Sequence, residues 1–174
     1  GAVESLEMLL GWDSPERGLI PPGEFLDVLE ASALMVPVGI HVLHESCRIA
    51  ASLPAAADGT LPAVHVNVSG RQLTSGDFTS SVSDALKETG LDPNRLILEL
   101  TETHMPQLTL PLLTDLAVLR EQGVRIALDD LGTGYSSLAR LTELPIDVLK
   151  VDRGFVLGIG ADDRCDAVVR AVVC

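Results

Sequence analysis

The seven residues VRIALDD at positions 124–130 show the pattern from which the fold of this chain of 174 residues can be predicted. A short aliphatic run over residues 124–128 follows Gly123 and has the length and composition of a buried β-strand. Two adjacent aspartates, Asp129 and Asp130, come directly after it. The stretch therefore predicts a strand that carries a pair of carboxylates at its C-terminal end.

Four other short apolar runs repeat this arrangement. Each carries a polar or charged residue near its C-terminal end, and the pairs are residues 6–10 with Glu7, 63–68 with Asn67, 96–100 with Glu99, and 148–151 with Lys150 and the following Asp152. We therefore expect five strands that present polar side chains at one end.

Amphipathic stretches separate these strands. We expect a helix of about ten residues opened by Pro21 and Pro22, and helices over residues 38–53, 80–89, 109–122, 136–141 and from 162 onward. Strands that alternate with helices indicate βαβ units and a parallel sheet. The expected fold is an α/β, TIM-like (β/α) barrel. Because a closed barrel needs eight strands and typically about 250 residues, we expect residues 1–174 to form a single partial domain without the last strands.

Composition narrows the choice of ligand. The net charge of −13 argues against DNA or RNA as a partner, because such proteins normally carry a basic patch. A phosphate ligand remains possible if cations lie between the two anions. The three cysteines have no metal-ligand spacing and suggest reduced thiols in a cytoplasmic domain. We also find no signal peptide or spanning segment, so any membrane attachment of the parent protein would come from outside these residues.

The polar strand ends are expected to meet. In a parallel barrel the C-terminal ends of all strands lie at one face, where active sites are built. Carboxylates gathered there would repel one another unless hard divalent cations bound them. Two adjacent aspartates suit a pair of cations with one bridging carboxylate, which can bind a phosphodiester and activate water. The alternative is that each acid only caps a following helix or faces solvent.

Four motifs carry a family resemblance. They are VNVS at 66–69 followed by Arg71, Gln72 and Leu73; ELTE at 99–102; DDLGTGYSSL at 129–138; and LKVD at 149–152. In this order they resemble the EAL domain, and the likeness covers nearly the whole chain. The resemblance implies a phosphodiesterase that hydrolyses cyclic di-GMP to the linear dinucleotide pGpG with two Mg²⁺ or Mn²⁺ ions per site.

The resemblance also implies roles for individual residues. It assigns Glu7, Asn67, Glu99 and Asp129 to the first metal, with Asp129 as the bridge and Asp130 as a ligand of the second metal. Lys150 would contact the attacking water or the phosphate, and Glu102 would fix the loop from Leu131 to Ser137. Leu9, Trp12 and Arg71 are expected on the substrate side, although packing explains Trp12 equally well. The family implies cyclic di-GMP as ligand, a possible homodimer, and regulatory or GGDEF-type domains in the parent protein.

The chain departs from the family pattern at three places. Met8 replaces an alanine at a position that should face away from the metals. Gly11 replaces an arginine that binds a substrate phosphate, and the loss of such a charge-assisted contact, roughly 1.5–3 kcal/mol, would weaken binding about ten-fold to a hundred-fold. The chain also ends at Cys174, before the family's last glutamate and glutamine strands, so we expect this piece alone to be inactive.

Two alternatives to the enzyme follow from these residues. The substitutions Met8 and Gly11 fit a degenerate EAL domain that acts as a non-catalytic receptor of cyclic di-GMP or as a protein-interaction module, whereas the retained acidic set favours an enzyme. Another metal-dependent barrel enzyme would explain the carboxylates but not the DDLGTGYSSL loop.

His65 shares a strand face with Asn67, and we expect it to be a core histidine whose hydrogen bonds are satisfied.

Overall fold

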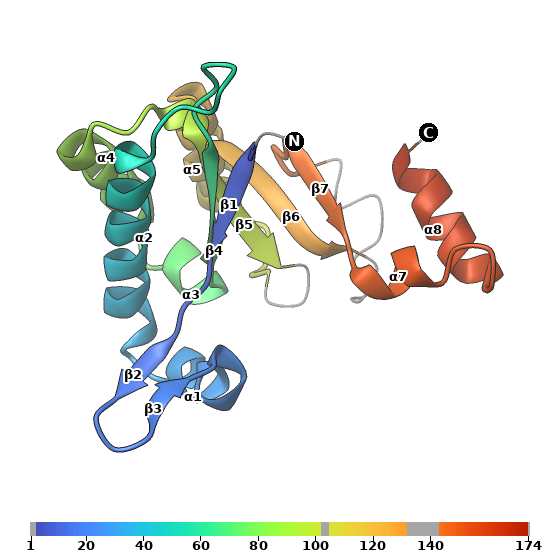
Figure 1. The fold of residues 1–174 in the computed structure, drawn as a ribbon, viewed down its shortest axis with the longest axis horizontal. Coiled ribbons are helices and arrows are strands. Elements are labelled where there is room, and N and C mark those ends of the chain that lie inside the picture. Colours follow the sequence, from blue (N-terminus) through green and yellow to red (C-terminus); the bar gives the residue numbers. More distant parts are fainter. Residues whose placement is uncertain (1–2, 102–104, 132–142, 174) are drawn as a thin grey trace.

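A single parallel sheet forms the centre of the computed structural model, which describes residues 3–101, 105–131 and 143–173. The five strands lie in the order β1-β4-β5-β6-β7, and every neighbouring pair is parallel (Figure 1). Their bounds are Ser5–Met8 (β1), Ala63–Val68 (β4), Leu96–Thr101 (β5), Arg125–Leu131 (β6) and Val148–Val151 (β7). The five expected strands are therefore confirmed, with ends that differ by up to three residues.

Helices connect the strands, and three of them cover one side of the sheet (Figure 1). The helices are α1 (Leu26–Ala31), α2 (Met35–Ser52), α3 (Gly70–Leu73), α4 (Phe78–Thr89), α5 (Leu110–Glu121), α7 (Arg153–Leu157) and α8 (Asp163–Val173), with 3-10 turns at Pro22–Glu24 and Pro93–Arg95. Local signals set several ends. The Thr109 side chain caps the start of α5, and Gly90, with a φ of 68°, ends α4.

The main core lies between the sheet and three helices. Alternate strand residues point outward from the sheet and pack under α2, α4 and α5, as in Val64, Val66 and Val68 of β4. They meet apolar side chains such as Leu43 of α2 and Leu116 of α5. This outer face is the hydrophobic side, so the remaining alternate residues point to the inner face of the sheet.

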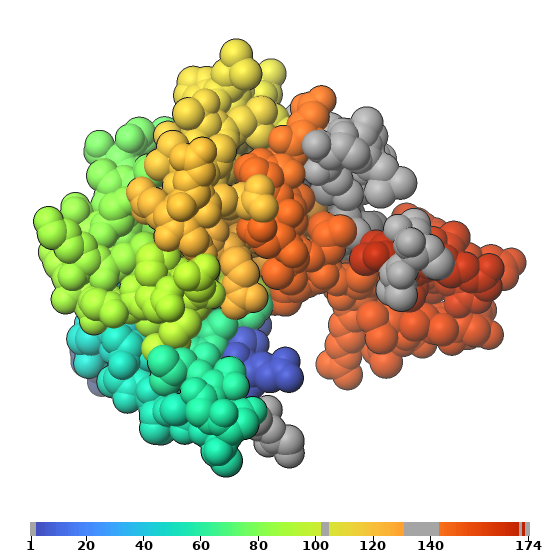
Figure 2. Space-filling view, turned by 90° about the horizontal axis from the view of Figure 1, so that it is seen from above, coloured from blue at the N-terminus to red at the C-terminus, as the bar shows by residue number. Residues whose placement is uncertain are grey.

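The inner face is apolar only near the N-terminal ends of the strands. There, Ala63, Ile97 and Ala127 are buried against Val148 and form a second, small core. Beyond this layer the same strand faces carry the polar residues predicted from the sequence. The sheet curls but does not close within the described residues, and Figure 2 shows an opening between the N-terminal segment and the C-terminal helices. The architecture is the expected TIM-like barrel in incomplete form.

Several local predictions were wrong. The helix expected after Pro22 is broken into the 3-10 turn and the six-residue α1, with a non-helical Phe25 between them. Residues 13–18, whose composition indicates a polar turn, lie within an antiparallel hairpin of β2 (Trp12–Ser14) and β3 (Gly18–Ile20) that was not predicted. The short helices α3 and α7 were not predicted. The helix expected over residues 136–141 lies outside the described residues.

None of the helices in the described part of the chain combines the length and the hydropathy needed to cross a bilayer.

Candidate active site and metal centre

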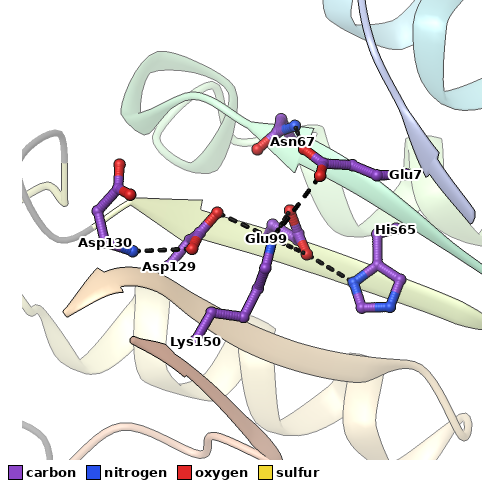
Figure 3. Close-up of polar contacts among 7 residues, drawn as sticks. All are labelled: Glu7, His65, Asn67, Glu99, Asp129, Asp130 and Lys150. Carbon is purple, nitrogen blue, oxygen red and sulfur yellow. Dashed lines mark hydrogen bonds and ion pairs between the residues drawn. The ribbon is translucent and has the colours of Figure 1, made fainter. Parts of the chain in front are cut away.

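Three carboxylates from three strands surround one ammonium group on the inner face of the sheet. Lys150 Nζ lies 2.8 and 2.9 Å from the two carboxylate oxygens of Glu99, 3.0 Å from Asp129 Oδ2 and 3.9 Å from Glu7 Oε2. Figure 3 shows these side chains pointing toward one another from β1, β5, β6 and β7. We call Glu7, Glu99 and Asp129 the carboxylate cluster.

Lys150 is held in its charged form. Burial alone would lower the pKa of its ammonium group, but the hydrogen bonds to Glu99 and Asp129 and their negative charges raise that pKa above its usual range. The lysine therefore supplies the positive charge that the carboxylate cluster needs.

Glu99 is the most enclosed member of the carboxylate cluster, because its side chain is 0% exposed. A buried carboxylate is stable only when charged or polar donors satisfy its oxygens. Besides Lys150, His65 provides such a contact, with Nδ1 2.5 Å from Glu99 Oε1. The expectation that His65 is a satisfied core histidine is correct, but its partner is a predicted metal ligand. Its place on the same strand face as Asn67 was the signal for this contact.

Glu7 lies at the rim of the cluster and contacts Asn67. Asn67 Nδ2 donates a hydrogen bond of 3.0 Å to Glu7 Oε1 across the β1–β4 pair. This leaves the second oxygen of Glu7 directed toward Lys150. Met8, the next residue, packs against the main core on the other side of the sheet, as predicted for a position that faces away from the cluster.

The two aspartates at the end of β6 point in different directions. The register between β6 and β7 shifts between Leu128 and Leu131, and Asp130 has a φ of 56°. Such a bulge re-aims side chains at the end of a strand. As a result Asp129 joins the carboxylate cluster, whereas the Asp130 carboxylate is directed away from Lys150 (Figure 3). The Asp130 backbone N–H donates to Asp129 Oδ1 at 2.9 Å.

The Asp130 carboxyl group has a raised pKa. Burial raises this pKa, the charges of Asp129, Asp152 and Glu7 raise it further, and the charge of Lys150 lowers it. Asp152, by contrast, accepts a hydrogen bond from the backbone N–H of Gly154 and caps α7. For Asp152 the simpler alternative of helix capping is therefore sufficient.

The donors fit a hard divalent cation in their chemistry. Carboxylate and amide oxygens are the ligands that Mg²⁺ and Mn²⁺ prefer, and the carboxylate cluster already converges on one cation, the lysine ammonium. Among the described residues no three His, Cys, Asp or Glu side chains are drawn together at metal-ligand distances. The oxygens stand 2.8–3.9 Å from the Lys150 nitrogen, so they would move inward by roughly 1–2 Å to reach Mg²⁺ at the same place. Their assignment as ligands stays a prediction.

An apolar cavity of about 320 Å³ opens beside the cluster. Asn67 and Asp130 form part of its polar wall, and Met8, Leu9 and Leu26 contribute to its apolar wall. The cavity lies between the C-terminal strand ends and the segment that contains α1 and α2. A ligand with an apolar or aromatic part could therefore be bound next to the charged groups.

Of the remaining predicted site residues, Leu9 lines this cavity, whereas Trp12 and Arg71 do not. Leu9 and Trp12 are exposed, and Trp12 packs edge-on against Phe25 with ring centroids 6.0 Å apart. Arg71 lines a separate pocket and donates to the carbonyl of Ser32 at 3.5 Å. Glu102 and most of the loop after Leu131 lie outside the described residues.

Comparisons with known proteins agree on the family and on the fold of this chain. The sequence model of the EAL domain matches residues 1–174. The phosphodiesterase MucR in complex with c-di-GMP is a similar solved structure, with 39% identity and a TM-score of 0.84 over 97% of this chain and 68% of that one. The EAL enzyme Bd1971, solved with cAMP and cyclic di-GMP bound, has 31% identity and a TM-score of 0.85 over 98% of this chain and 47% of that one.

Curated relatives carry the same segment within longer proteins. The bifunctional diguanylate cyclase/cyclic di-GMP phosphodiesterase MucR of Pseudomonas aeruginosa is 39% identical over 99% of this chain and 25% of its own length. The cyclic di-GMP phosphodiesterase PdeR of Escherichia coli is 38% identical over 99% of this chain and 26% of its own length. The chain thus spans about a quarter of these relatives. On the family match and the shared fold, this chain belongs to the EAL domain family.

Proposed function

We propose that this chain is the catalytic domain of a phosphodiesterase that hydrolyses cyclic di-GMP to the linear dinucleotide pGpG with the help of divalent cations. The observation that carries the proposal is the convergence of Glu7, Glu99 and Asp129, from three strands, on one cation at the C-terminal end of a parallel sheet. The activities for which MucR and PdeR are named support the same reaction.

The metal would be Mg²⁺ or Mn²⁺, with two ions per site. Glu7, Asn67, Glu99 and Asp129 would hold the first, and Asp129 and Asp130 the second. The raised pKa of the Asp130 carboxyl group supports this assignment, because a cation beside it would offset the repulsion from its acidic neighbours. When bound, the cations would supply Lewis acidity to the phosphodiester and to the attacking water.

The chain's own residues would perform the rest of the reaction. In the hydrolysis, water adds to phosphorus and one ester P–O bond breaks, which leaves a phosphomonoester and a free hydroxyl group. The Lys150 ammonium would leave its place between Glu99 and Asp129 and bind the phosphate or orient the water. Leu9, Trp12 and Arg71 would contact the rest of the dinucleotide, and Glu102 would fix the loop after Leu131.

The proposal extends to the surroundings of the domain. We place the chain in the cytoplasm, within a larger protein that carries regulatory or GGDEF-type domains and that forms homodimers. The bifunctional name of MucR supports a cyclase module beside an EAL domain in at least one relative.

An assay of the full-length protein tests the proposed function. Purified protein would be incubated with cyclic di-GMP and Mg²⁺ or Mn²⁺, beside an Asp129→Asn variant and a control, Asp84→Asn, on the exposed face of α4. We expect Asp129→Asn to lose at least about 100-fold in turnover, because a metal contributes several kcal/mol to the transition state, and Asp84→Asn to retain activity. Tight binding of cyclic di-GMP without cleavage by the wild type would instead support a receptor.

A further inference from the structure

Two of the described residues, Lys150 and His65, make polar contacts with the side-chain oxygens of Glu99. His65 lies on β4, on the inner face of the sheet, and its side chain is only 15% exposed. Its Nδ1 atom is 2.5 Å from Glu99 Oε1 (Figure 3). The residue lies outside the acidic and amide set of the predicted metal site.

The direction of this hydrogen bond follows from the state of Glu99. Both oxygens of Glu99 lie within 2.9 Å of the Lys150 ammonium, as expected for an ionised carboxylate. An ionised carboxylate can only accept hydrogen bonds. The His65 Nδ1 atom must therefore carry the hydrogen and donate it, whether the ring is neutral or charged.

A divalent cation bound in the carboxylate cluster would affect the two hydrogen-bond donors to Glu99, Lys150 and His65, in different ways. The lysine ammonium sits at the centre of the carboxylate cluster, so a divalent cation bound there would compete with it directly. His65 approaches Oε1 from the side, along the neighbouring strand, where the register pairs His65 with Ile97 and Asn67 with Glu99. Because His65 lies on a paired strand and outside the centre of the cluster, its contact with Oε1 does not have to break when Lys150 moves.

We infer that His65 is a positioning residue for the metal site, which fixes the Glu99 carboxylate in the orientation that a divalent cation in the carboxylate cluster requires. A donor behind a metal-ligating carboxylate orients it, and the loss of such a donor typically costs about 10-fold to 100-fold in metal affinity or activity. The role rests on the proposed function only for the identity of the cation. The hydrogen bond itself is independent of the reaction catalysed.

The test replaces the donor and then restores it. His65→Leu removes the hydrogen-bond donor with little change in side-chain volume, whereas His65→Asn places an amide N–H close to the position of Nδ1. His41→Leu, at an exposed position on α2, is the matched control. Mn²⁺ affinity of the full-length protein is measured by calorimetry and by the electron paramagnetic resonance signal of free Mn²⁺, and thermal unfolding is recorded without metal.

We expect His65→Leu to bind Mn²⁺ about 10-fold to 100-fold more weakly than the wild type, and His65→Asn to recover most of the loss. In the hydrolysis assay the Mn²⁺ concentration for half-maximal activity rises in the same order, while the KM for cyclic di-GMP at saturating Mn²⁺ stays within about two-fold, as expected if only metal affinity is affected. A merely structural histidine would lower the unfolding temperature without this ordered change in metal affinity.

Two results would overturn the role of His65. One is wild-type Mn²⁺ affinity in His65→Leu; the other is an equal loss in His65→Leu and His65→Asn when both unfold at the wild-type temperature. Failure of the proposed function is a separate result: a wild type that binds Mn²⁺ but does not cleave cyclic di-GMP would refute the reaction, and the ordered Mn²⁺ affinities would still support the positioning role.

Discussion

Lys150 Nζ lies 2.8 Å from Glu99 Oε1, so an ammonium group occupies the centre of the carboxylate cluster. The same nitrogen is 3.0 Å from Asp129 Oδ2, and the contacts join β5, β6 and β7 on the inner face of the sheet. Removing the charged group would leave the three carboxylates to repel one another. Lys150 is therefore expected to stabilise the metal-free protein, and a metal bound in the cluster would compete with it for the same oxygens.

This double role predicts the behaviour of Lys150→Met. We expect metal-free protein to unfold at a lower temperature, Mn²⁺ to bind at least as tightly as in the wild type, and turnover of cyclic di-GMP to fall about 100-fold or more through loss of a charged group that contacts the phosphate or water. Lys87→Met, at an exposed position on α4, serves as the control. Weaker Mn²⁺ binding by Lys150→Met would show that the lysine does not compete with the metal.

Gly11 offers a gain-of-function prediction. A side chain added at this position would meet only the tip of Leu19, at 3.1 Å, and Leu19 is 77% exposed and free to move. An arginine there can form the phosphate contact that the family pattern implies. We expect Gly11→Arg to lower the KM for cyclic di-GMP about ten-fold, whereas Gly11→Ala, which adds no charge, leaves it unchanged. An unchanged KM in Gly11→Arg would contradict the assignment.

The contact between α2 and α3 leaves little room for an added methyl group, so a small substitution there should lower the stability of the protein. A methyl group at Gly39 would lie 2.2 Å from Gln72 Nε2. Gln72 is buried and forms the capping box of α3 with Ser69, directly after β4. Displacing it should cost about 1–3 kcal/mol, more than the helix-propensity gain of up to about 1 kcal/mol.

The measurement for Gly39→Ala is thermal unfolding. For a chain of this size, each kcal/mol corresponds to a shift of about 2–4 °C, so a fall of a few degrees is expected. Gly23→Ala is the matched control, because nothing lies within 4 Å of the added methyl group. If Gly39→Ala were as stable as Gly23→Ala, the tight α2–α3 contact would be refuted.

The ion pair between Arg120 and Asp147 holds the segment before β7 against α5. Arg120 donates to both oxygens of Asp147, at 3.0 Å from Nε and at 2.5 Å from a second nitrogen. Burial alone would raise the pKa of Asp147, but hydrogen bonds from Arg120 and from the Ile126 backbone lower that pKa below its usual range.

A depressed pKa stabilises the folded protein when the carboxyl group is ionised. This contribution is present above the unfolded-state pKa of Asp147, about 3.9, and is lost as the pH falls toward the lower folded-state value. We expect Arg120→Met to reduce the free energy of unfolding by less than about 1 kcal/mol at pH 7, since the pair is partly exposed, and by a smaller amount at pH 3. Urea unfolding at both pH values measures this, and an equal loss at both would contradict it.

The sequence predicted the strands and their polar ends well because both rest on short-range patterns. Aliphatic runs of four to six residues produced β4, β5 and β7 within one residue of their observed ends. The rule that the C-terminal ends of parallel strands meet at one face then predicted that Glu7, Asn67 and Glu99 lie together. The α5 helix was predicted equally closely, because Thr109, Pro111 and Gly123 mark its ends.

What the sequence did not predict depends on longer-range contacts or on very short elements. The strands of the β2–β3 hairpin are three residues each, too short for an alternating pattern. The hydrogen bond between His65 and Glu99 depends on the register of β4 against β5, over 34 positions of sequence. The different directions of the Asp129 and Asp130 side chains follow from the register shift between Leu128 and Leu131, which the amino-acid types do not predict.

Anomalous X-ray diffraction from crystals soaked in Mn²⁺ tests the central claim most directly. We predict a manganese peak bounded by the carboxylates of Glu7, Glu99 and Asp129, with the Lys150 ammonium displaced from its present place between Glu99 and Asp129. Crystals that contain Mn²⁺ elsewhere, while Lys150 keeps its contacts to both acids at saturating metal, would contradict the claim that this cluster is the metal centre of the domain.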